Sequence, residues 1–111
     1  MLELAIQNQF DNFMVTPKAK TIYFGERFCV KKFLDNSTLI KDFARKIRSA
    51  SSRAILVVPG IVPEKDFERV TEVVLNSLDN LDSIISSDYG ICHHFSKKCE
   101  VIYEGEVFNN L

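Results

Sequence analysis

Glycine is scarce in this 111-residue chain, and its four glycines are scattered along the sequence. They form neither the GxGxxG pattern of dinucleotide-binding folds nor the GxxxxGK[ST] pattern of nucleoside triphosphatases. Both patterns use closely spaced glycines to bring backbone N–H groups to a phosphate. The sequence therefore contains no glycine-rich phosphate-binding loop.

Cysteine and long apolar runs are sparse too. The three cysteines, Cys29, Cys92 and Cys99, are odd in number and lack the spacing of a disulfide framework, so we expect reduced thiols. No apolar run approaches the ~18 residues of a membrane span. The start MLELAIQNQF lacks the basic region of a signal peptide. These absences predict a cytoplasmic protein with no membrane partner.

Charge is balanced overall but not along the chain. The formal net charge of −1 argues against a dedicated nucleic-acid binder, although contact with RNA stays open. Residues 1–53 hold ten Lys/Arg against five Asp/Glu, and residues 54–111 hold four against ten. Either this imbalance is a chance property of solvated surface, or opposite faces attract in an assembly, or the basic half meets an anion.

Short apolar runs and helical periods dominate what is present. Four runs end near a glycine, namely TIYFG, AILVVPG, DSIISSDYG and CEVIYEG, and LELAI near the start is a candidate fifth. Continuous runs of β-branched and aromatic residues predict parallel strands that are covered on both faces. Between them, apolar residues recur with the helical period, which predicts helices over residues 37–50, 63–78 and 88–95.

This alternation predicts a single α/β domain over residues 1–111, with five mostly parallel strands and right-handed crossovers. Two arrangements of this sheet are possible. An open, flavodoxin-like doubly wound sheet would be complete with five strands. A TIM-like barrel requires about 250 residues, so this chain would supply slightly more than half of one.

In either fold the ligand side lies beyond the carboxyl ends of the strands. Glu26 and Arg27 follow the first glycine-ended run and Asp88 lies at the end of the third, so these three are the candidate catalytic residues. Two carboxylates held close together can share a proton and act as an acid–base pair. The alternative is that the carboxylates cap loops or helix starts, and Asp88 is well placed to be such a cap.

Residues 92–99, CHHFSKKC, raise the question of a metal. Cys92, His93, His94 and Cys99 have suitable side chains but lack paired CxxC or HxxxH spacing. Successive residues on a helix point about 100° apart, so these donors do not converge. We therefore predict no metal site, with Cys92 buried and the histidines exposed.

Cys29 lies beyond a strand end, close to Arg27, Lys31 and Lys32. Their positive charge favours the thiolate form of a cysteine. No motif pairs Cys29 with a particular histidine, so the sequence does not assign it as a nucleophile.

Four segments follow one another along the chain: IYFGERFCVKKF, VVPGIVPEKDFERV, LDSIISSDYGICHHF and VIYEGEVFNNL. In this order they resemble the collagenase-like peptidases, the unassigned-type peptidase family 32, nearest to its ubiquinone-biosynthesis and hydroxylation branch. The likeness covers residues 20–111 and implies the N-terminal half of a TIM-like barrel. The Pro-Ala-Gly motif usual after the first strand of the family is missing, because Gln7, Asn8 and Gln9 stand there.

The resemblance also bears on cofactors. The ubiquinone branch holds a four-iron cluster through cysteines, which implies Cys29 as one ligand. Neither Cys92 nor Cys99 matches a remaining ligand position. We therefore expect no cofactor in this chain alone, and an iron–sulfur cluster only where a partner or a missing domain supplies ligands.

Two functions from different classes follow. In the first, the chain is a truncated or partial family member that acts on peptide, RNA base or quinone precursor, with Glu26, Arg27, Cys29 and Asp88 lining the strand-end face. In the second, it is a non-catalytic binding or assembly module. A half-barrel leaves edge strands and part of its inner face uncovered, and exposed edges template pairing. We therefore expect a homodimer or a missing partner domain.

Overall fold

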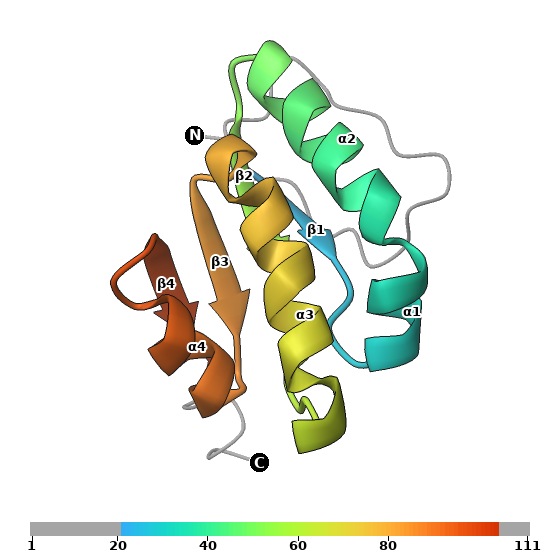
Figure 1. The fold of residues 1–111 in the computed structure, drawn as a ribbon. Coiled ribbons are helices and arrows are strands. Elements are labelled where there is room, and N and C mark those ends of the chain that lie inside the picture. The colour runs from blue at the N-terminus through green and yellow to red at the C-terminus, as the bar shows by residue number, and fades with distance from the viewer. Residues whose placement is uncertain (1–20, 105–111) are drawn as a thin grey trace.

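The computed structural model describes residues 21–104, which form a four-stranded sheet with helices packed on one face (Figure 1). The strands are β1 (Thr21–Gly25), β2 (Arg53–Val57), β3 (Ser83–Ser86) and β4 (Glu100–Tyr103). They lie side by side in chain order, and each neighbouring pair is parallel. The parallel α/β class is confirmed. The candidate fifth strand, LELAI, lies outside the described residues.

The helices are α1 (Val30–Asp35), α2 (Ser37–Ser49), α3 (Glu64–Ser77) and α4 (Tyr89–Phe95), with a 3₁₀ turn, η1 (Leu78–Asn80), after α3. Helices α2, α3 and α4 match the three predicted ones to within two residues at each end. None of the helices in the described range is long and apolar enough to cross a membrane.

Helix α1 was not predicted. Its N-cap is Cys29, whose Sγ accepts a weak hydrogen bond from the Lys32 N–H at 3.5 Å. Asn36 ends α1 and at the same time begins α2. Because a thiol is not one of the side chains that usually cap a helix, the sequence gives no start signal at this point.

The two faces of the sheet carry separate apolar clusters. Side chains alternate between the faces of a strand, so Ile22 and Phe24 of β1 lie on the helix side with Leu56 and Ile84. Buried residues of all four helices belong to this larger cluster, among them Phe33, Ile47, Val74 and Phe95. The helices therefore bury most of one face of the sheet, while Val101 of β4 is only half-buried there.

The second face carries a smaller cluster of strand residues. Within the described range it contains Tyr23, Ile55, Val57, Ile85 and Ile102. Ile55, Val57 and Ile85 are only 2%, 0% and 9% exposed, so the central residues of this face are buried.

The two outer strands of the described sheet differ in exposure. Strand β1 is buried at four of its five residues. Strand β4 is exposed at Glu100 and Tyr103 and half-buried between them. Of the two outer strands, β4 is therefore the more exposed to solvent.

Candidate functional site at the carboxyl ends of the strands

Hydrogen bonds tie together the loops that leave β1, β2 and β3. The Gly60 N–H donates to the Arg27 carbonyl at 2.9 Å, and the Ser86 hydroxyl donates to the Pro59 carbonyl at 3.0 Å. The Ser87 hydroxyl donates to the Gly60 carbonyl at 3.2 Å, and a Cβ at Gly60 would collide with this hydroxyl. The predicted common edge is therefore present. We call it the rim, formed by residues 25–29, 58–63, 86–89 and 103–104.

Glu26 serves as a buried cap at the rim. Its side chain is directed into the turn before α1, where Oε2 accepts hydrogen bonds from the N–H groups of Phe28 (2.9 Å) and Cys29 (3.0 Å). The residue is only 5% exposed. A carboxylate held by two backbone donors stabilises the turn that leads into α1.

Asp88 caps two segments at once. Its Oδ1 accepts a hydrogen bond from the Ile91 N–H at 3.0 Å, which makes it the N-cap of α4. Its Oδ2 accepts from the Val62 N–H at 2.8 Å, in the loop that follows β2. Both oxygens are thus engaged with backbone donors, and this is the capping alternative that the sequence left open.

Arg27 forms an ion pair across the rim with Glu104, 77 residues away in the chain. Its Nη1 lies 2.6 Å from both carboxylate oxygens of Glu104. The two side chains are 15% and 13% exposed, so the pair is largely removed from water. It joins the loop after β1 to the end of β4. Glu104 was not among the candidate catalytic residues, although it directly follows the last apolar run.

Cys92 and Cys99 lie in surroundings that favour the neutral thiol. Burial, helped by the charges of Asp88 and Glu104, raises the pKa of the Cys92 thiol to about 11, and its Sγ donates to the Ser86 carbonyl at 3.4 Å. Burial also raises the pKa of Cys99. Within residues 21–104 no three His, Cys, Asp or Glu side chains are arranged to hold a metal.

The two histidines of α4 face different neighbours. His93 stacks on Tyr89, with ring centroids 5.9 Å apart and an interplanar angle of 20°. His94 instead lies edge-on to Phe67, at 5.7 Å and 90°. Both histidines are exposed and Cys92 is 7% exposed, as the sequence predicted.

Large apolar side chains are exposed along the rim. They are Phe28 (73% exposed), Ile61 (80%), Tyr89 (69%) and Tyr103 (52%). We call these four residues the rim patch. The rings of Tyr89 and Tyr103 lie 6.2 Å apart, nearly perpendicular at 83°. Outside the rim, the only other exposed large apolar residues in the described part of the chain are Leu39 and Leu75. The hydrophobic periodicity of a sequence identifies buried residues, so it did not predict these exposed ones.

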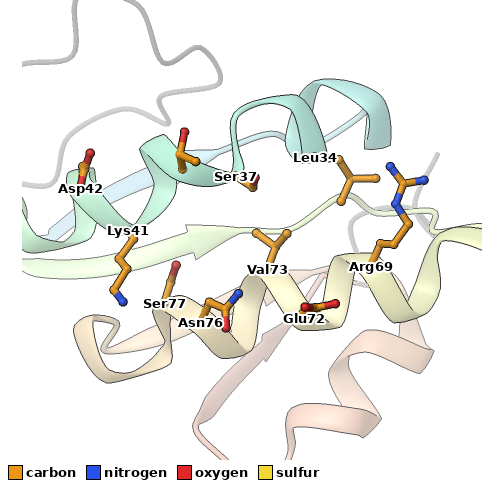
Figure 2. Close-up of a pocket in the computed structure, with 10 residues that line it drawn as sticks. Leu34, Ser37, Lys41, Asp42, Arg69, Glu72, Val73, Asn76 and Ser77 are labelled. Atoms are coloured by element: carbon orange, nitrogen blue, oxygen red, sulfur yellow. The ribbon is translucent and has the colours of Figure 1, made fainter.

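A groove of about 660 Å³ lies on the helical layer, away from the rim patch, between α2 and α3 (Figure 2). Figure 2 shows Lys41 extending from α2 toward α3, and Arg69 and Glu72 on the α3 side. Half-buried Leu34 and Val73 also line it. Because its walls carry both signs of charge, the groove does not select an anion or a cation.

Comparisons with protein-family models, with curated proteins and with solved structures find no match to this chain. The fold and the rim together define a parallel α/β protein with an apolar surface at the carboxyl ends of its strands.

Proposed function

We propose that this chain is a non-catalytic binding or assembly module and that the rim patch is its binding surface. One contrast carries the proposal: the charged groups of the rim are bound to groups within the chain, whereas its four large apolar side chains are 52% to 80% exposed. Exposed apolar patches with polar surroundings mark interaction sites. Aromatic residues and arginine are also the types enriched in protein interfaces.

The state of the carboxylates supports binding over catalysis. A general base must be within hydrogen-bond reach of the proton that it abstracts. Glu26 and Asp88 instead accept from backbone N–H groups inside the chain, and Glu104 is paired with Arg27. An acid–base reaction would first have to break these contacts.

We also propose that the sheet is part of a TIM-like half-barrel and not of a doubly wound sheet. A doubly wound sheet has helices on both faces and a point at which strand order reverses. The described strands follow chain order, and the described helices pack on one face. Under this proposal, the resemblance to the collagenase-like peptidases reflects ancestry in which the fold was kept and the chemistry was lost.

Two measurements test the proposed function. Binding of the apolar dye 1-anilinonaphthalene-8-sulfonate should fall in Phe28→Ser/Ile61→Ser and stay unchanged in the matched control Leu39→Ser/Leu75→Ser, which alters apolar residues outside the rim. Labelled casein should not be hydrolysed. Equal dye binding by the two variants, or hydrolysis that disappears in Glu26→Gln, would contradict the proposal.

A further inference from the structure

We propose that the groove between α2 and α3 is a second binding site of this chain, and that its ligand is a small zwitterion, a molecule with an anionic oxygen group at one end and an ammonium group at the other. The groove lies away from the rim patch, so this site goes beyond the proposed function and does not depend on it. Its volume of about 660 Å³ is within the range of roughly 300–1,000 Å³ that is typical of small-molecule sites.

One lysine distinguishes the α2 wall of the groove. The described residues contain seven lysines, of which six are exposed and only Lys41 is half-buried. Figure 2 shows its side chain extending from α2 toward α3. Lys41 has no ion-pair partner within residues 21–104. Because charges that leave water are normally paired, a half-buried ammonium group without a carboxylate beside it favours an anionic ligand group.

A buried hydroxyl on the α3 wall lacks a partner too. Ser77 is the last residue of α3, lines the groove and is only 1% exposed. Figure 2 shows its hydroxyl directed toward α2. This hydroxyl forms no hydrogen bond with any other described residue. Since buried polar groups are nearly always hydrogen-bonded, an acceptor oxygen of a ligand between Ser77 and Lys41 would bind both donors.

Three further charged residues line the groove, and one of them is placed to bind the ammonium group. Arg69 pairs with Asp66 at 3.5 Å, and Figure 2 shows the Asp42 carboxylate directed away from α3. Glu72, by contrast, is exposed on the α3 wall and forms no ion pair in the described part of the chain. A ligand of one charge pairs with Lys41 or with Glu72 alone, whereas a zwitterion pairs with both.

The α3 wall also sets the length of the ligand. Glu72 and Ser77 are five residues apart on α3, which is about 7.5 Å along the axis at a rise of about 1.5 Å per residue. Half-buried Val73 lies between them on this wall (Figure 2). The ligand therefore needs two charged ends separated by a comparable length and an apolar middle that packs on Val73. 6-Aminohexanoate has this form, and hexanoate and hexylamine are matched probes that each keep one charged end.

Isothermal titration calorimetry with the full chain tests the site. 6-Aminohexanoate should bind at least about tenfold more tightly than hexanoate or hexylamine, because only this probe pairs with both charges of the groove. Lys41→Met should remove its advantage over hexylamine, and Glu72→Gln should remove its advantage over hexanoate. The controls Lys46→Met and Glu68→Gln alter exposed residues of the same two helices outside the groove and should leave all three affinities unchanged.

Ser77→Ala separates binding from folding. Because the hydroxyl has no partner in the described chain, its removal should leave the melting temperature nearly unchanged and weaken the binding of 6-aminohexanoate severalfold. A lower melting temperature with unchanged binding would overturn the role of this hydroxyl. The site itself is overturned if 6-aminohexanoate does not bind at millimolar concentration, if the three probes bind equally, or if Lys41→Met and Glu72→Gln bind them as the wild type does.

Discussion

The rim and the groove between α2 and α3 both gather charged and apolar side chains, but they arrange them in opposite ways. At the rim, Arg27 and Glu104 are 15% and 13% exposed, while Phe28 and Ile61 are 73% and 80% exposed. In the groove, Asp42, Arg69 and Glu72 are exposed, and the apolar residue Val73 is half-buried. The groove thus exposes charged residues, whereas the rim exposes large apolar ones.

The largest effect that distinguishes the rim is expected from its ion pair. Arg27→Ala should lower the free energy of unfolding by about 3 kcal/mol, because it leaves Glu104 largely desolvated without its partner. The control is Arg53→Ala, whose pair with Glu100 is 53% and 60% exposed and should contribute less than about 1 kcal/mol. Urea denaturation measures both. Equal losses would show that the rim pair is no more desolvated than a surface pair.

Next in size is the loss of the double cap. Asp88→Ala should lower the free energy of unfolding by about 2 kcal/mol, because the Ile91 and Val62 N–H groups both lose their acceptor. The control Asp35→Ala removes an exposed ion pair with Lys31 and should lower the free energy of unfolding by about 0.5 kcal/mol or less. Thermal unfolding compares the two. A loss for Asp88→Ala no larger than for Asp35→Ala would remove the structural role assigned to this carboxylate.

A smaller effect concerns pH and the buried thiol beneath the rim. Burial raises the pKa of Cys92 from its ordinary value of 9.0 to about 11, so the thiol ionises in the unfolded chain before it ionises in the folded one. Its contribution to stability is therefore fully present below pH 9 and is lost as the pH rises toward 11. Cys92→Ala should flatten the fall in melting temperature over this range. If the melting temperatures of the wild type and of Cys92→Ala fell in parallel over this pH range, the raised pKa of Cys92 would be contradicted.

Much of the fold was predictable from local patterns. The runs TIYFG, AILVV, DSIIS and CEVIY gave the four described strands, and the helical period gave α2, α3 and α4. Parallel pairing followed from alternation, and the common edge followed from parallel pairing. Helix α1 was missed because Cys29 is an unusual cap and Asn36 divides the helical segment in two.

The candidate site was less predictable, because its properties depend on non-local contacts. The contact of Arg27 with Glu104 spans 77 residues, and no local pattern links the two. Position past a strand end correctly placed Glu26 and Asp88 at the rim, but it did not show that backbone N–H groups bind them. The exposure of Ile61 depends on how the loop after β2 is held by Gly60 and Ser87.

Binding of 1-anilinonaphthalene-8-sulfonate by the two matched double variants tests the importance of the rim most directly. Weaker binding by Phe28→Ser/Ile61→Ser than by Leu39→Ser/Leu75→Ser is the predicted result. Equal binding by the two variants would contradict it.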